Sequence, residues 1–228
     1  DGSAHFSTDS DIGSKGKYSI QHQISSGGAS SGPASTIMLG CCGGYTEMPI
    51  SQGFNVTNSN NHVFIIDKSG SMHSDQRLNL AKAAMVDALY KLTPRQKFYI
   101  YFFNHESHPM PGDSKRGFQW EVDTICSWID EQSPEGFTDP LNSIRDTFER
   151  IQPETIWLLT DGRFNCPGGG KAVRELIQNL NTNQLIRVNT VGFHRRPESV
   201  DAILGEIATD NNGTYYFSRS HDLSVPSQ

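Results

Sequence analysis

Three oxygen-bearing side chains, Asp67, Ser69 and Ser71, stand at alternate positions directly after a short apolar run. The run, residues 63–66, has no polar position, which is typical of a strand covered on both faces in a parallel sheet. The chain then turns at Gly70, and residues 76–92 carry an amphipathic helical pattern. The three side chains are therefore expected on a loop between a strand and a helix.

A carboxylate and two hydroxyls in one loop point to the binding of a hard cation. Oxygen donors of this kind suit Mg²⁺, Mn²⁺ or Ca²⁺ and suit zinc or copper poorly. Open α/β sheets also bind their ligands outside the carboxyl ends of parallel strands. We expect Mg²⁺ here, with Mn²⁺ or Ca²⁺ as alternatives.

Two further oxygen donors follow in later loops. Thr138 lies in the segment Glu-Gly-Phe-Thr-Asp-Pro, and Asp161 follows an apolar strand pattern at residues 155–160. Asp-x-Ser-x-Ser in a strand-to-helix context, completed by this threonine and this aspartate, resembles the metal-ion-dependent adhesion site of the von Willebrand factor type A family. The resemblance covers residues 60–220 and is closest in style to bacterial members. It implies a five-residue metal shell: Asp67, Ser69, Ser71, Thr138 and Asp161.

The charge of this shell suggests what the metal would do. Two carboxylates just neutralise a divalent ion and leave it able to accept one more anionic oxygen. The resemblance implies that this oxygen is an Asp or Glu carboxylate of a partner protein, which predicts a metal-dependent adhesion or assembly module. One alternative is a structural subunit in which the metal only joins the loops and residues 1–59 mediate self-association. The other alternative is a degenerate site that holds no metal.

Four residues near the motif are candidates for the rim of a ligand-binding surface. His73 follows the first loop, and Arg163 and Phe164 follow Asp161. Phe137 stands where many relatives have a second glycine before the threonine, so it could restrict that loop without removing a ligand. For each of the four, ordinary loop packing or a solvated surface position is the alternative.

The order of patterns predicts an α/β fold with a doubly wound, mostly parallel central sheet, helices on both faces and right-handed crossovers, similar to a Rossmann fold. Expected strands are 63–67, 97–103, 155–160, 185–192 and 214–218, with a short edge strand near 107–110. Expected helices are 76–92, 119–131, 140–150, 170–180 and 198–209.

The first quarter of the chain has a different composition from the rest. Residues 1–59 are rich in Ser, Gly, Asn and Gln, and we expect an irregular or β-rich extension before a von Willebrand factor type A domain at 60–228. Short extended pieces are expected at 18–24, 36–39 and 54–57. The chain begins at Asp1 without an initiator methionine or a signal peptide, as in a processed or truncated piece.

Composition excludes some partners and leaves the compartment open. A formal net charge of −6 and a pI near 5.7 argue against nucleic acid as the main partner. No apolar run is long enough to span a bilayer. Cys126 is expected in the core and Cys166 in an accessible loop, while the disulfide state of these two and of Cys41 and Cys42 stays open. We expect an extracytoplasmic location, in the cell envelope or secreted, with the cytoplasm as the alternative.

Enzymatic activity is not expected. Serine, histidine and aspartate converge on one rim, as they do in hydrolases. However, no Gly-x-Ser-x-Gly elbow surrounds Ser69 or Ser71. A hydroxyl bound to a hard cation is also not obviously paired with a base. We therefore name no catalytic residue.

Overall fold

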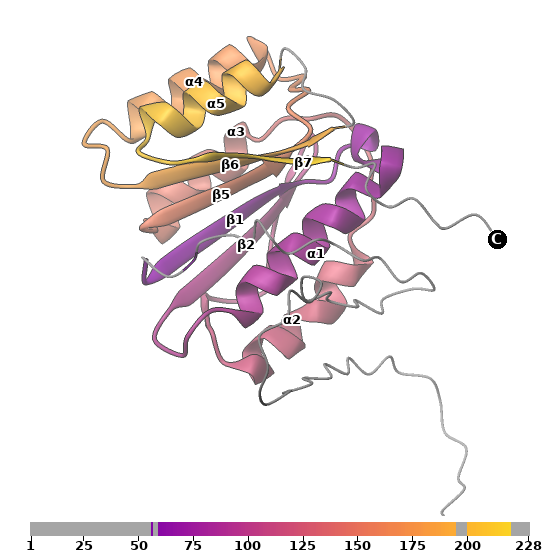
Figure 1. Ribbon diagram of the computed structural model, residues 1–228, viewed down its shortest axis with the longest axis vertical. Helices are drawn as coiled ribbons and strands as arrows, with labels where there is room; N and C mark the ends of the chain where they lie inside the picture. Colours follow the sequence, from indigo (N-terminus) through magenta and orange to yellow (C-terminus); the bar gives the residue numbers. More distant parts are fainter. Residues whose placement is uncertain (1–55, 57–58, 195–199, 220–228) are drawn as a thin grey trace, which may run out of the picture.

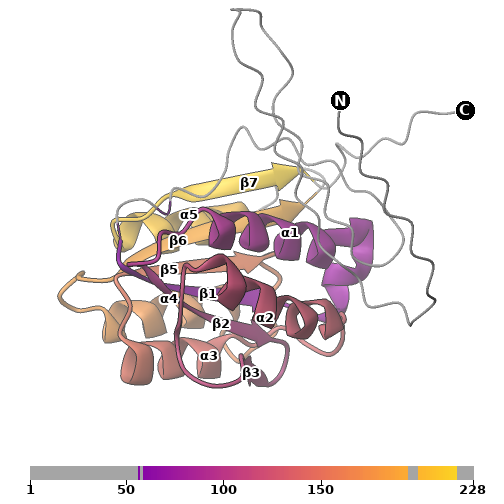
Figure 2. The ribbon, with the colours of Figure 1, turned by 90° about the horizontal axis from the view of Figure 1, so that it is seen from below.

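The computed structural model describes residues 56, 59–194 and 200–219. Within them the chain forms one central sheet with helices on both sides (Figures 1 and 2). Most of the expected N-terminal extension, including the pieces at 18–24 and 36–39, lies outside the described residues.

The sheet has the order β3-β2-β1-β5-β6-β7, with β4 paired to β2. Neighbours along β2-β1-β5-β6-β7 run parallel, and the short β3 and β4 pair with β2 in the antiparallel direction. The mostly parallel sheet predicted from the sequence is confirmed. The strands are β1 Asn61–Asp67, β2 Lys97–Phe103, β3 Ser107–Pro109, β4 Lys115–Arg116, β5 Thr155–Thr160, β6 Arg187–His194 and β7 Tyr215–Arg219.

Helices cover both faces of this sheet. One face carries α1 and α2, which pack against each other, and the other carries α3, α4 and α5 (Figures 1 and 2). This division follows from right-handed crossovers, because the chain moves one way from β1 to β2 and the opposite way from β5 to β7. The helices are α1 Arg77–Tyr90, α2 Gln119–Glu131, α3 Leu141–Asp146, α4 Gly169–Leu180 and α5 Val200–Asp210.

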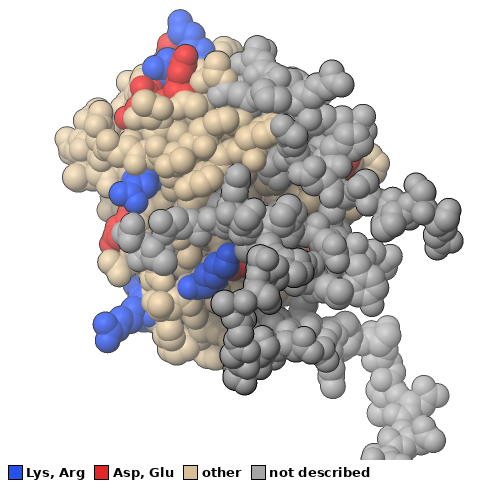
Figure 3. Space-filling view, viewed as in Figure 1, with Lys and Arg blue, Asp and Glu red and all other residues tan. Residues whose placement is uncertain are grey.

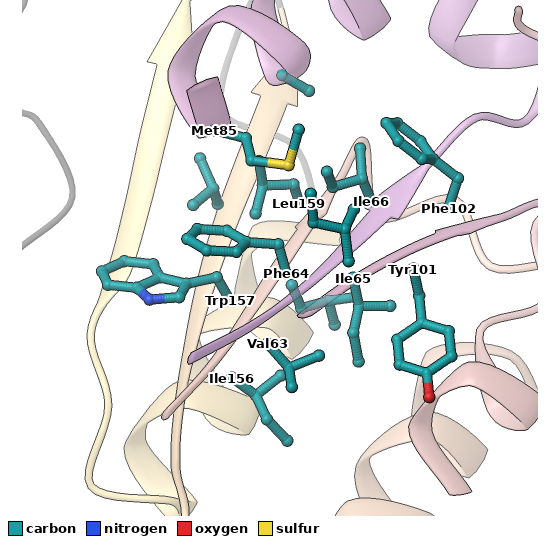
Figure 4. Packing of buried hydrophobic residues seen from close by; sticks show 14 of the residues in the cluster. Val63, Phe64, Ile65, Ile66, Met85, Tyr101, Phe102, Ile156, Trp157 and Leu159 are labelled. Atoms are coloured by element: carbon teal, nitrogen blue, oxygen red, sulfur yellow. The ribbon is translucent and has the colours of Figure 1, made fainter. Parts of the chain in front are cut away.

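The core is built around β1, whose side chains from 62 to 67 are all buried. Phe64 and Ile66 point to one face of the sheet, and Val63 and Ile65 point to the other (Figure 4). Phe64 stacks on Trp157 of β5 with ring centroids 6.5 Å apart. A strand that is buried on both faces reads as a continuous apolar run, which is why the sequence revealed this element clearly.

Local structure departs from the predicted elements at two helices. The helix expected at 76–92 is preceded by a short 3-10 segment, η2 Gly70–Gln76, which contains left-handed residues at Asp75 and Gln76 (φ 54° and 55°). These two residues end η2 and force α1 to begin at Arg77. The helix expected at 140–150 changes after α3 into a π-helical turn, η3 Thr147–Ile151.

Gln96 connects the first described residues to one end of the sheet. This end lies opposite the loop that carries Asp67, Ser69 and Ser71. Its side-chain amide donates to the carbonyl oxygens of Val56 (2.5 Å) and Ser59 (2.7 Å). His62 Nε2 also lies 3.1 Å from the Ser59 carbonyl oxygen, and its Nδ1 is buried without a partner among the described residues. These polar groups hold Val56 and Ser59 against the sheet.

Candidate functional site

The candidate metal residues lie where the direction of the sheet connections reverses. The chain leaves β1 toward β2 on one side and leaves β5 toward β6 on the other, and β1 and β5 are neighbours. The carboxyl ends of two such strands form the crevice in which open α/β sheets bind ligands. Asp67 is the last residue of β1, and Asp161 directly follows β5.

Hydrogen bonds to both carboxylate oxygens fix the orientation of Asp67. Oδ1 accepts from the backbone N–H of Ser69 at 2.8 Å, and Oδ2 accepts from Thr160 Oγ1 at 2.6 Å. The same Thr160 hydroxyl accepts from the backbone N–H of Gly162 at 2.9 Å. Thr160 therefore joins the end of β1 to the turn that carries Asp161.

The two serines of the first loop lie together. Ser69 Oγ and Ser71 Oγ are 3.1 Å apart, a separation that suits two oxygens facing one ion. Ser69 directly precedes η2, which begins at Gly70, so the tight turn aims both hydroxyls to the same side.

Backbone hydrogen bonds hold the second loop against the first. Glu135 N–H donates to the carbonyl of Lys68 at 2.8 Å, and Gly70 N–H donates to the carbonyl of Gly136 at 3.0 Å. The side chains of Lys68 and Glu135 add an ion pair at 3.1 Å. The loop that carries Thr138 is thus paired to the metal motif along its length.

The third loop is joined to the second in the same way. Asn165 N–H donates to the carbonyl of Thr138 at 2.9 Å, and Asp139 N–H donates to the carbonyl of Asn104 at 2.7 Å. Thr138 is itself buried. The three loops that carry the five predicted ligands are therefore brought together by main-chain bonds.

Burial governs the electrostatics of Asp67. The pKa of this carboxyl group is raised to about 7, chiefly because the group is buried away from water; the nearby Asp161 carboxylate also raises it, and hydrogen bonds from Ser69 and Thr160 oppose the rise. Two buried carboxylates at one place repel each other. A cation between them would relieve this repulsion and favour the ionised form of Asp67.

A buried arginine already partners the second carboxylate. Arg77 Nη1 donates to Asp161 Oδ2 at 3.0 Å, and Asp161 Oδ1 accepts from the backbone N–H of Arg163 at 3.2 Å. Neither Arg77 nor Thr160 was predicted from the sequence as part of the site. Thr160 has a detectable signal, a hydroxyl directly after four apolar residues at the end of a buried strand, whereas Arg77 looks like any charged residue at a helix start.

The four predicted rim residues have different surroundings. His73 and Arg163 are exposed. Phe137 is 70% exposed and lies edge-to-face with His105, at 6.4 Å between ring centroids. Phe164 is half-buried and packs against the core, as the alternative of loop packing predicted for it.

The donor set fits a hard cation. It offers three hydroxyls and two carboxylates on adjoining loops, and Mg²⁺ prefers such oxygen ligands. No three His, Cys, Asp or Glu side chains gather into a possible metal site within the described part of the chain. A site made mainly of hydroxyls would not produce such a cluster.

The two cysteines within the described residues are not among the five predicted donors. Cys126 is buried, as predicted, but Cys166 is buried too, and both are free thiols. The prediction of an accessible Cys166 is wrong because its thiol turns inward and donates to the carbonyl of Gly169 at 3.5 Å. On the face shown in Figure 3, Lys and Arg atoms form small separate groups and no continuous basic surface.

Comparison with known proteins settles the family. The family model for the von Willebrand factor type A domain matches residues 60–217. The chain belongs to this family. This von Willebrand factor type A chain is also 25% identical over 154 residues to human von Willebrand factor A domain-containing protein 3B. That match covers 67% of the chain and 11% of the human protein, so the chain spans about a tenth of its relative's length.

Solved structures show the same fold. A von Willebrand factor type A protein from Catenulispora acidiphila superposes with a TM-score of 0.61 at 21% identity, covering 70% of this chain and 38% of the other. Proximal thread matrix protein 1 from the mussel byssus, in a structure described as having a zinc-occupied MIDAS motif, gives a TM-score of 0.54 at 20% identity. That match covers 72% of this chain and 42% of the mussel protein. Among the described helices of this von Willebrand factor type A chain, none combines the length and apolarity needed to cross a membrane.

Proposed function

We propose that the chain is a protein-binding module whose affinity depends on a divalent cation. Asp67, Ser69, Ser71, Thr138 and Asp161 hold the ion, and an Asp or Glu carboxylate of a partner protein completes its shell. The observation that carries this proposal is the meeting of three oxygen-rich loops at the switch point of the sheet.

The way in which the loops are joined supports a binding role over a purely structural one. Lys68, Gly70, Thr138 and Asn104 each take part in a main-chain bond between loops. Because these bonds hold the loops in place without an ion, a metal used only to pin them would add little. The donor set also carries just two carboxylates, which leaves a divalent ion with a place for one outside anion.

The proposed ion is Mg²⁺, with Mn²⁺ or Ca²⁺ as alternatives. The zinc in the mussel byssus structure belongs to that protein. Oxygen-only donors favour the harder ions for this chain. Calorimetric titration of the chain with each chloride salt would rank them.

The test uses two matched comparisons. Peptide arrays are probed with the chain in Mg²⁺ and in EDTA, and every Asp or Glu in a bound peptide is replaced in turn by Asn or Gln. We expect binding to disappear in EDTA and on replacement of one acidic residue. Equal binding with and without chelator would refute the proposal.

Asp67→Ala provides the control variant. The side chain lies at the rim beyond the apolar part of β1, and burial disfavours its charge, so its removal leaves the sheet folded. Calorimetry should show no Mg²⁺ uptake, and circular dichroism should show an unchanged spectrum. Unchanged Mg²⁺ uptake by this variant would remove Asp67 from the proposed site.

The alternative role, an assembly subunit that self-associates through residues 1–59, makes a different prediction. Its assembly would persist without metal. Light scattering of the 228-residue chain in EDTA, compared with a chain that lacks residues 1–55, separates the two roles. If the full chain forms large particles in EDTA and the chain without residues 1–55 does not, the role as an assembly subunit would be favoured.

We also propose that the chain acts by binding alone, without catalysis, and outside the cytoplasm. Among the described residues no histidine forms a hydrogen bond with Ser69 or Ser71, so neither hydroxyl has a base to activate it. Hydrolysis of an ester or phosphate that is lost in Ser69→Ala would contradict the first point. Fractionation of the source cells tests the second.

A further inference from the structure

Arg77 places a buried positive charge inside the candidate metal site. Its side chain is 8% exposed, Nη1 lies 3.0 Å from Asp161 Oδ2, and Nη2 lies 3.5 Å from Asp75 Oδ2. Asp161 is itself fully buried. The contact therefore joins a guanidinium to a proposed metal ligand away from water, where charge interactions are strong.

Local preferences do not explain this position. Arg77 is the first residue of α1, where the helix dipole disfavours a positive charge. Its Nε is buried and has no hydrogen-bond partner among the described residues, which costs free energy. The contact with Asp161 must offset both costs.

The backbone before Arg77 is also strained, and this strained turn places Arg77 at the site. Asp75 and Gln76 have φ values of 54° and 55°, a left-handed conformation that costs non-glycine residues roughly 1–2 kcal/mol each. This turn ends η2 and starts α1 directly beside the metal motif. Strain of this kind at a site is a reason to look for a functional role.

We propose that Arg77 is a resident counter-cation that competes with the divalent ion for Asp161 and so weakens metal binding. This inference rests on the proposed function, because it concerns the same site. The guanidinium cancels one of the two negative charges that Asp67 and Asp161 offer. It stabilises the metal-free site, and a divalent ion must bind against its charge.

The proposal predicts that removing the charge tightens metal binding. Arg77→Met retains an unbranched apolar stem but has no charge, and Arg77→Lys retains the charge but loses the planar fork. Titration calorimetry of the full chain with MgCl₂ should give a dissociation constant at least about tenfold lower for Arg77→Met, a change of the size that one nearby charge exerts on proton binding. Arg77→Lys should stay within about threefold of the unmodified chain.

Two controls separate this effect from net charge and from misfolding. Lys91→Met removes one positive charge at the other end of α1, where Lys91 pairs with Asp87, and should leave Mg²⁺ affinity unchanged. If Arg77→Met unfolds without metal, the rise in melting temperature with Mg²⁺ is measured for Arg77→Gln instead. That rise should exceed the rise for the unmodified chain.

The outcomes distinguish this inference from the proposed function. Mg²⁺ uptake by the unmodified chain with no tighter binding by Arg77→Met or Arg77→Gln overturns the role of Arg77 and leaves the metal-dependent module standing. Uptake by Arg77→Met alone supports the role of Arg77 and refutes a metal-dependent function of the unmodified chain. No uptake by any variant overturns both.

Discussion

Thr160 Oγ1 donates a 2.6 Å hydrogen bond to Asp67 Oδ2 and thereby links the two central strands at the candidate metal site. The residues are 93 positions apart in the sequence, and their strands are parallel neighbours. Because the hydroxyl also accepts from Gly162 N–H, one side chain orients the first carboxylate and the turn of the second.

Thr160→Val tests this link. Valine keeps the shape but removes the hydroxyl, so a buried carboxylate loses a donor and Gly162 N–H loses an acceptor. We expect the free energy of unfolding to fall by about 1–3 kcal/mol and Mg²⁺ affinity to fall with it. Thr160→Ser keeps the hydroxyl and should retain Mg²⁺ affinity in calorimetry. Equal Mg²⁺ affinity of the valine and serine variants would show that the bond does not support the site.

Gly136→Ala tests the loop that carries Thr138. Gly136 has a φ of 74°, and an added Cβ would lie 2.4 Å from His105 Nδ1. Gly112→Ala is a matched control, since Gly112 has a φ of 79° and open space around it. We expect a loss of stability of about 1 kcal/mol at Gly112 from the backbone alone and about 2 kcal/mol at Gly136, measured by urea denaturation.

The additional loss of stability of Gly136→Ala over Gly112→Ala should come from the clash between the new Cβ and the imidazole of His105. His105→Ala, combined with Gly136→Ala, removes the atoms that the new Cβ meets first. The double variant should then recover most of the difference between the two alanine variants. Equal losses at Gly112 and Gly136 would mean that the loop adjusts without cost.

Gln76→Gly should stabilise the protein. Gln76 is exposed and left-handed (φ 55°, ψ 28°), and glycine adopts this conformation without the steric cost. We expect a gain of about 0.5–1 kcal/mol in the free energy of unfolding, since the greater freedom of glycine in the unfolded chain offsets part of the relief. Asn79→Gly, in the regular part of α1, should instead destabilise by about 0.5 kcal/mol. A loss at both positions would contradict the strain assigned to Gln76.

His62 should make stability depend on pH below neutrality. Burial lowers the pKa of its imidazole below the usual 6.5, so the unfolded chain takes up a proton that the folded protein resists. Above about pH 6.5 His62 therefore does not change the free energy of unfolding. Below this pH the free energy of unfolding falls, by at most about 1.4 kcal/mol per pH unit.

His62→Gln isolates this contribution. Denaturation curves between pH 5 and pH 7.5 should show a smaller loss of stability on acidification for the variant than for the unmodified chain. The difference between the two chains is the readout, because Asp67 and other groups titrate in both. Parallel pH profiles would show that His62 does not take part.

The sequence was sufficient to predict the fold and to name five oxygen donors for the candidate metal site. A buried parallel strand carries an unbroken apolar run, as residues 63–66 do, and helices between such strands dictate a doubly wound sheet. The loops at strand ends then bring Asp67 and Asp161 to one edge, because adjacent parallel strands end together.

Tertiary structure alone decided how that site is charged and held together. Periodicity places Arg77 at the start of a helix, but only the folded chain brings its guanidinium to Asp161, 84 positions away. The left-handed turn before it leaves no mark in the hydrophobic pattern, since the backbone angles of two polar residues do not alter that pattern. The proposed donors could therefore be named from the sequence, whereas the counter-charge depends on contacts between distant segments.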